Sequence, residues 1–291
     1  MESKAAGSST MAVVINVDTY PVTALALLSL RCGCSVPILL LDCSRRKIER
    51  ARARALARHL SIDYQSAPLR PHGITLDWLF GHLAAERVLL VDSDAELLDP
   101  DLIELLDAST RAKDCFGAGF VQETSTIGQG DTPYAVYMRR MWIPFCMLRT
   151  SLVRKSLAAG RSFDHFKVYN DVPALPGLSR LLSLRNRLPM ARRWSLKFLD
   201  RFRNEFYGVK PSIVYHDTGA EIFSWLLERG YRFDELAWER QREMVLHHHG
   251  VTRRRLNRFD NNSASPAEVA GYARRRIEEH YAHMLPVDLL P

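Results

Sequence analysis

Short apolar runs alternate with longer helical stretches through the first third of the chain. Three runs rich in Val, Ile and Leu have the length of buried strands rather than of helices, and they cover residues 11–17, 36–41 and 88–91. Stretches with helical character lie between or after them, over residues 22–30, 45–60, 75–85 and 99–106. This alternation predicts a mostly parallel sheet with helical crossovers, which is an α/β fold.

The middle of the chain has a less regular pattern. Residues 115–121 predict a further strand, and residues 122–134 predict a polar, glycine-containing loop. Residues 142–148 form an apolar segment with aromatic side chains, and residues 150–159 predict a helix. The length of the loop suggests that it has a function.

The last third contains one clear amphipathic helix. It starts after Asp217 and ends near Gly230, a residue that suits a helix C-terminal cap. Its apolar stripe consists of Ile222, Phe223, Leu226 and Leu227. Extended pieces are predicted at residues 231–233 and 244–246, and a helix that is polar on most sides at residues 266–284.

Carboxylates follow three of the predicted strands. Asp92 and Asp94 come directly after the run 88–91, and Asp18 and Asp42 follow the two earlier runs. Ligands of open α/β sheets bind at the carboxyl ends of the strands. Paired carboxylates there can hold a divalent cation, which in turn can hold a diphosphate, so the pattern indicates a nucleotide site. The alternative is that these acids only end strands and cap helices.

Three consecutive histidines, residues 247–249, follow the predicted strand 244–246. In an extended chain His247 and His249 lie on one face, within reach of one ligand. A ligand role is favoured over a solvent-exposed cluster because three histidines in a row inside a chain are uncommon.

Charge is distributed unevenly along the chain. The 291 residues include 40 Lys and Arg against 33 Asp and Glu, which gives a net charge of +7 and favours an anionic partner. Residues 177–203 are strongly basic, and Asp200 is their one acid. Apolar residues are interleaved there, so two short amphipathic helices can lie on an anionic membrane, form a solvated face or bind nucleic acid.

Composition narrows the possible classes. No apolar run approaches the roughly 18 residues of a membrane span. The five cysteines match no zinc-ligand spacing, which predicts reduced thiols in a cytosolic protein. The small, polar residues 1–10 lack the features of a secretory signal and are expected to be disordered.

These motifs, in this order, resemble those of the GT-A glycosyltransferases, most closely the inverting family-two type. The similar segments are Asn16-Val17-Asp18, Leu41-Asp42-Cys43-Ser44, Val91-Asp92-Ser93-Asp94, His216-Asp217-Thr218 and the late His247-x-x-Gly-x-Thr252. The resemblance implies a Rossmann-like mixed sheet flanked by helices, with a basic helical insertion.

The resemblance also implies how the chain is divided. Residues 11–262 are expected to form one catalytic domain, with a nucleotide-binding half at 11–122 and an acceptor-binding half at 123–262. The basic insertion covers about residues 165–210, and residues 263–291 form a C-terminal helical tail.

The activity implied is transfer of a sugar from a nucleotide-diphosphate-sugar donor to an acceptor hydroxyl, with inversion, in cell-surface glycan or glycolipid synthesis. The acceptor is a glycan or a lipid-linked glycan. The expected location is the cytoplasm, with peripheral contact to the inner face of the membrane through residues 177–203 and no nucleic-acid partner.

Residue roles follow from the matched motifs. The nucleotide-sugar contacts are Asn16, Asp18, Asp42, Asp92 and Ser93, and Mg²⁺ or Mn²⁺ is held by Asp92, Asp94, His247 and His249. Asp217 is the catalytic base. Trp142, beside Arg140, can line the acceptor pocket because sugars stack on aromatic faces, and the alternative is that Trp142 is a core residue.

The chain departs from the family at several of these motifs. His216 stands where the family has Glu, and Ser162-Phe163-Asp164 resembles a family segment that precedes the base, which leaves Asp171 as a rival to Asp217. Rival functions are a sugar nucleotidyltransferase and a non-enzymatic module that binds membranes or nucleic acid. The first lacks its glycine-rich phosphate loop after residue 17, and the second leaves the acidic strand ends unexplained.

Overall fold

The computed structural model describes residues 10–129, 132–169, 184, 213–248 and 265–291. The predicted insertion therefore lies almost wholly outside the described residues, as do the basic stretch 177–203, Asp171 and His249. Within the described part, no helix is long and apolar enough to cross a membrane.

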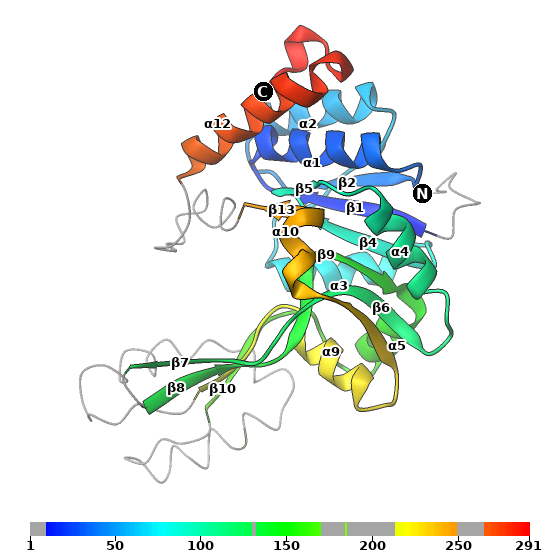
Figure 1. The fold of residues 1–291 in the computed structure, drawn as a ribbon, viewed down its shortest axis with the longest axis vertical. Helices are drawn as coiled ribbons and strands as arrows, with labels where there is room; N and C mark the ends of the chain where they lie inside the picture. The colour runs from blue at the N-terminus through cyan, green and yellow to red at the C-terminus, as the bar shows by residue number, and fades with distance from the viewer. Residues whose placement is uncertain (1–9, 130–131, 170–183, 185–212, 249–264) are drawn as a thin grey trace.

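A seven-stranded mixed sheet forms the centre of the molecule, in the order β12-β6-β9-β4-β1-β2-β3 (Figure 1). Its strands are β1 (Thr10–Asn16), β2 (Ile38–Asp42), β3 (Asp63–Ser66), β4 (Arg87–Asp92), β6 (Cys115–Gln122), β9 (Arg140–Arg149) and β12 (Arg232–Leu236). All neighbours are parallel except β9, which runs antiparallel to both β4 and β6. The predicted strands at 11–17, 36–41, 88–91 and 115–121 are confirmed, whereas β3 was not predicted because its four residues are polar.

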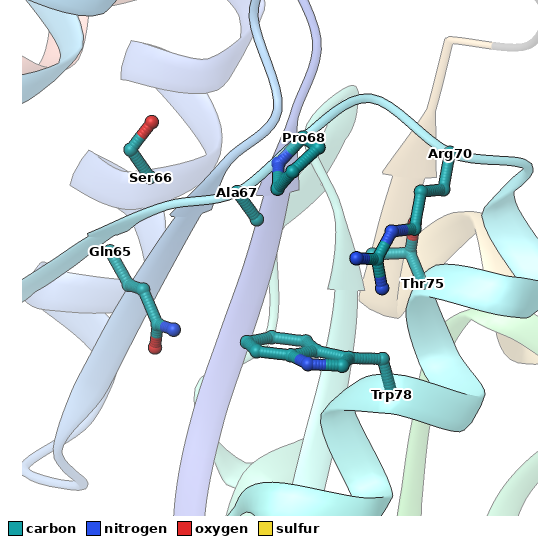
Figure 2. Close-up of a pocket in the computed structure, with 7 residues that line it drawn as sticks. All are labelled: Gln65, Ser66, Ala67, Pro68, Arg70, Thr75 and Trp78. Atoms are coloured by element: carbon teal, nitrogen blue, oxygen red, sulfur yellow. The ribbon is translucent and has the colours of Figure 1, made fainter. Parts of the chain in front are cut away.

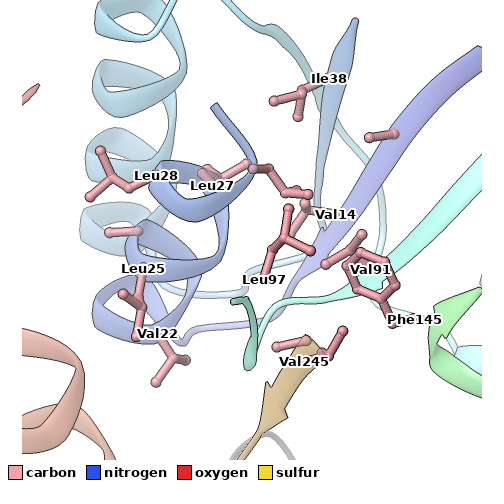
Figure 3. Packing of buried hydrophobic residues seen from close by; sticks show 14 of the residues in the cluster. Val14, Val22, Leu25, Leu27, Leu28, Ile38, Val91, Leu97, Phe145 and Val245 are labelled. Carbon is pink, nitrogen blue, oxygen red and sulfur yellow. The ribbon is translucent and has the colours of Figure 1, made fainter. Parts of the chain in front are cut away.

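Helices cover both faces of this sheet. On one face lie α1 (Tyr20–Gly33), α2 (Lys47–His59), α4 (Asp101–Ser109) and α12 (Pro266–Arg276), and on the other lie α3 (His72–His82), α5 (Thr150–Ala158) and α9 (Ala220–Leu227). Side chains of a strand alternate between its faces, so Val14 belongs to the first core, which Figure 3 shows, and its neighbour Val13 belongs to the second. The predicted fold class, a Rossmann-like mixed sheet flanked by helices, is confirmed.

A smaller four-stranded sheet projects from the body (Figure 1). Its order is β10 (Phe166–Tyr169), β11 (Ile213–His216), β8 (Thr132–Tyr137) and β7 (Ser125–Gln129). The prediction of a loop over residues 122–134 is wrong, because most of this stretch belongs to the antiparallel β7–β8 pair. A hairpin that projects from the body has little core to face, so its polar residues gave no strand signal.

A two-stranded sheet joins β5 (Ala95–Leu97) to β13 (Val245–His247). The two strands are antiparallel, and His247 pairs with Ala95. The pair sits where β4 ends, and α10 (Gln241–Met244) leads into it. This pairing brings together residues about 150 positions apart in the chain.

The C-terminal helix is part of the core. Val269, Ala273 and Ile277 are buried in the same cluster as β1 and α1, and the Tyr20 hydroxyl donates to the Leu289 carbonyl at 2.7 Å. The predicted helix at 266–284 is α12 followed by a π-helical turn (Ile277–Tyr281) and a 3-10 turn (Ala282–Met284). The helix is polar on most sides, as the sequence predicts, and its apolar residues Val269, Ala273 and Ile277 recur every fourth position as one buried stripe.

Candidate metal and substrate site

Three predicted ligands converge at the carboxyl end of β4. Asp92 ends the strand, Asp94 follows in a tight turn, and the β13–β5 pairing places His247 beside them. The His247 Nε2 lies 3.1 Å from a carboxylate oxygen of Asp94 and 3.5 Å from one of Asp92. The His248 amide also donates to the Asp94 carbonyl at 2.9 Å, which fixes the turn against β13.

The chemistry of these donors fits a divalent cation. One ligand atom from each of Asp92, Asp94 and His247 lies within 4.8 Å of the other two. Carboxylate oxygens with one imidazole nitrogen suit Mn²⁺, and carboxylates suit Mg²⁺. Burial would lower the pKa of His247, but hydrogen bonds to Asp92 and Asp94 and their charges raise it to about 9. A cation would replace that proton.

Trp142 packs against His247 at the edge of the site. Its indole is only 2% exposed and meets the His247 ring edge-to-face at a centroid distance of 5.5 Å. The predicted acceptor contact does not fit this position, because a buried indole offers no face to a sugar. Trp142 instead fixes the orientation of a metal-ligand candidate.

His72 is a neighbour of the site that no sequence motif indicates. Its Nε2 lies 3.9 Å from a carboxylate oxygen of Asp92, and its side chain is 40% exposed. It sits at the first turn of α3, where Gly73 lies against residues 163–164 so closely that a Cβ would fall 2.3 Å from the Asp164 Cα. The signal was a histidine–glycine pair at a helix start, which by itself does not indicate a site.

Asn16, Asp42 and Ser44 form a buried network at the ends of β1 and β2. The Asp42 carboxylate accepts from Asn16 Nδ2 at 3.1 Å, from the Ser44 amide at 3.0 Å and from the Tyr64 hydroxyl at 2.7 Å. Both Asn16 and Asp42 are fully buried. The network holds the strand ends in place, and direct contact of these two residues with a nucleotide stays a prediction.

Asp18 and Ser93 fix the adjoining loops. One Asp18 carboxylate oxygen accepts from the amides of Arg45 and Arg46, each at 3.0 Å, just before α2 begins. Asp18 itself adopts a left-handed conformation with a φ of 51°. The Ser93 hydroxyl lies 3.3 Å from that of Thr19, which ties the loop after β1 to the turn after β4.

A pocket of about 90 Å³ opens beside this network, between the end of β3 and α3 (Figure 2). It is lined by Gln65, Ser66, Ala67, Pro68, Arg70, Thr75 and Trp78. Ser66 pairs with Asp42 across β2 and β3, so the pocket belongs to the same sheet edge as the acidic strand ends. The sequence does not predict this pocket, because β3, which carries Gln65 and Ser66, has no apolar run.

Asp217 lies at the junction of β11 and α9. Its carboxylate is 3.0 Å from Arg140 Nη2, and its side chain is 30% exposed. Gly219, with a φ of 84°, allows the tight entry into α9, where a Cβ would fall 2.9 Å from Met141 Cε. Arg140 and Trp142 are two residues apart on β9, a spacing of roughly 7 Å in a strand. Asp217 and the metal-ligand candidates are thus joined through one strand.

The chain matches no protein-family model and no curated protein. Among solved structures it is similar to a mannosyltransferase from Pyrobaculum calidifontis in complex with GDP-mannose and Mn²⁺, with 11% identity and a TM-score of 0.40 over 50% of this chain and 46% of that one. It is also similar to glucosyl-3-phosphoglycerate synthase from Mycobacterium tuberculosis, with 12% identity and a TM-score of 0.37 over 51% and 59%. A third is 4-diphosphocytidyl-2C-methyl-D-erythritol synthase from Anaerococcus prevotii, at 14% identity and a TM-score of 0.40 over 52% and 76%. The chain thus spans about half the length of the two transferases, and the site itself has to identify the chemistry.

Proposed function

We propose that the protein is a GT-A type glycosyltransferase that moves a sugar from a nucleotide-diphosphate donor to an acceptor hydroxyl with inversion. The observation that supports this best is the convergence of Asp92, Asp94 and His247 at the carboxyl end of β4. Such a set can hold Mg²⁺ or Mn²⁺, which would neutralise the charge that develops on the departing diphosphate. Asp217 is ion-paired with Arg140 of β9, and the same strand carries Trp142 against His247, which supports Asp217 as the base for the acceptor.

The reaction is a single displacement. The acceptor oxygen bonds to the anomeric carbon on the face opposite the diphosphate, and the carbon–oxygen bond to the diphosphate breaks with its electron pair on the leaving group. Asp217 takes the proton of the attacking hydroxyl. Arg140 at one oxygen and the Thr218 amide at the other, at 2.9 Å, fix the orientation of the Asp217 carboxylate that receives that proton.

The donor base has a candidate pocket at the end of β3. Trp78 provides an aromatic wall, and Gln65 and Arg70 provide polar groups (Figure 2). Such a combination suits a planar heterocycle with hydrogen-bonding edges. The buried Asp42 network forms the floor beside it and holds β3 in register through Tyr64.

A nucleotide-binding screen tests this function. The melting temperature is measured with UDP, GDP and dTDP, each with and without Mn²⁺. A rise for one nucleotide that requires the metal supports the proposal and names the base. No rise with any pair contradicts it, and a rise with a nucleoside triphosphate accompanied by pyrophosphate release would favour a sugar nucleotidyltransferase.

Two finer predictions belong to the same proposal. The first is that the acceptor is a glycan or is lipid-linked, as in glycan synthesis. The second is that residues 177–203 contact an anionic membrane, so that the reaction takes place at a membrane surface. Flotation with anionic lipid vesicles tests the second, because a protein that stays at the bottom of the gradient makes no such contact.

A further inference from the structure

Two tyrosines stand side by side on the projecting sheet, next to Asp217. Tyr137 of β8 pairs with Tyr215 of β11, and their rings stack at a centroid distance of 4.7 Å with an interplanar angle of 9°. Both side chains are partly exposed. That spacing equals the distance between neighbouring strands, so the rings stand side by side and upright on the sheet.

The tyrosines share a face with the proposed base. Tyr215 and Asp217 are two residues apart, and in an extended chain such residues point to the same side. The β8–β11 ladder extends through Tyr215, whose carbonyl accepts from the Met138 amide at 3.0 Å. Asp217 follows the end of β11 at His216, and its charge adds to burial in raising the pKa of Tyr137, so the carboxylate lies near that ring. His216 points to the opposite side and stacks on Phe166. The Asp217 carboxylate and the two phenols therefore line one surface.

The two ring faces of Tyr137 differ. Its inner face is covered by Tyr215, whose far face lies under the Lys167 ammonium at 5.0 Å from the centroid. Its outer face adjoins Ser125, the cross-strand partner in β7, whose exposed side chain is too small to cover a ring. Burial and the charges of Tyr215 and Asp217 raise the pKa of Tyr137, so its phenol remains a proton donor at neutral pH.

We propose that Tyr137 and Tyr215 form the acceptor platform and that the acceptor is a saccharide. This inference rests on the proposed function. A sugar has a C–H face that packs on an aromatic ring and hydroxyls that bond to phenols, and the upright pair offers both. The sugar ring lies on the outer face of Tyr137, its hydroxyls bond to the phenols, and the attacking hydroxyl lies at Asp217.

The test measures release of nucleoside diphosphate from the donor that carries the base found in the nucleotide screen. Methyl α- and β-glycosides of glucose, galactose and mannose are the acceptor probes. We expect at least one glycoside to accelerate release, and Tyr137→Ala and Tyr215→Ala each to raise its KM by about tenfold, the effect of losing one ring contact or hydrogen bond. Tyr137→Phe, which keeps the ring, should raise the KM less than Tyr137→Ala.

Tyr231 offers a matched control, because it also carries a lysine over its ring, with Lys155 Nζ 5.5 Å from the centroid. Tyr231→Ala should leave the KM for the glycoside unchanged. An unchanged KM in Tyr137→Ala and Tyr215→Ala, with melting curves that show both variants folded, overturns the platform. A donor that binds with metal while no glycoside accelerates release overturns the saccharide acceptor and leaves the glycosyltransferase standing. A protein that binds no nucleotide overturns the proposed function itself.

Discussion

Asp217 is the residue on which the proposed reaction depends most directly. Its carboxylate is partly exposed and ion-paired with Arg140, outside the cluster that would hold a cation. We predict that Asp217→Asn keeps the metal-dependent nucleotide shift and lowers sugar transfer about 10²- to 10⁴-fold, the usual loss when a general base is removed. Asp101→Asn, at the exposed start of α4, is the control and should transfer normally. Wild-type turnover by Asp217→Asn would show that Asp217 is not the base and would favour Asp171 in that role.

His247 makes the stability of the metal-free protein depend on pH. Its folded-state pKa of about 9 lies above the ordinary value of 6.5, because the attraction of Asp92 and Asp94 exceeds the cost of burial. A raised pKa contributes stability that is complete below pH 6.5 and is lost as the pH rises through 9. The full contribution is about 3 kcal/mol.

Urea unfolding with a chelator, at about pH 6 and about pH 9.5, measures this contribution. Wild type should lose about 3 kcal/mol more between the two values than His247→Gln, which does not titrate there. Equal losses in the two proteins would show that the imidazole is not held between the carboxylates as the structure has it.

The sequence predicted individual site residues unequally, for a physical reason. Asp92 and Asp94 follow an apolar run, so local pattern alone places them at a strand end. His247 lies beside these carboxylates because β5 pairs with β13, which no local pattern reveals. The prediction that it joins them came from the family resemblance. For Trp142 the sequence left a core position and an acceptor contact open, because an aromatic residue on a strand has the same local signature in both cases, and the structure shows it buried.

At the scale of elements, α12 is joined to the site by a buried ion pair. The Glu96 side chain is fully buried in β5, and Arg276 donates to it from Nη2 at 2.7 Å and from Nε at 3.1 Å. Removing Arg276 would leave a buried carboxylate whose remaining side-chain bond among the described residues is a long one from the Tyr272 hydroxyl, at 3.4 Å. Because Glu96 pairs with Leu246, a disturbance of β5 reaches His247 directly.

Arg276→Ala is therefore expected to lower the free energy of unfolding by about 3 kcal/mol or more, as for other buried pairs broken on one side. It should also weaken the stabilisation by Mn²⁺. Arg274→Ala, an exposed position on the same helix, should change neither quantity. Calorimetry with and without Mn²⁺ measures the stability of both variants. An Arg276→Ala protein as stable as Arg274→Ala would refute the role assigned to the Glu96–Arg276 pair.

Elements were predicted where they face a core and missed where they do not. Strands β1, β2, β4 and β6 are buried along most of their length, so apolar runs identify them. The strands of the projecting sheet carry no such run, and their register depends on partners distant in the chain, such as β11 beside β8. The projecting sheet was therefore harder to predict from the sequence than the central sheet.

At the scale of the whole molecule, one sheet lies between two apolar cores. The first core contains residues from both ends of the described chain. Alternate residues of each strand contribute to the cores on its two faces, so neither core can form without the sheet. The first core also contains Val269, Ala273 and Ile277 from the C-terminal helix. The predicted nucleotide-binding half, which ends near residue 122, therefore shares its core with residues beyond 264.

This architecture predicts that damage at the C-terminal helix destabilises the entire protein at once. Ile277 is fully buried, and Ile277→Ala should cost about 2–5 kcal/mol, the usual effect of a large-to-small change in a core. Val287→Ala, at a side chain that is 85% exposed, should cost almost nothing. In Ile277→Ala, far-UV and near-UV circular dichroism should report one lowered melting temperature, because Trp142 and Trp225 belong to different cores on one sheet. An early far-UV transition that leaves the near-UV signal intact would instead show that the helix melts by itself.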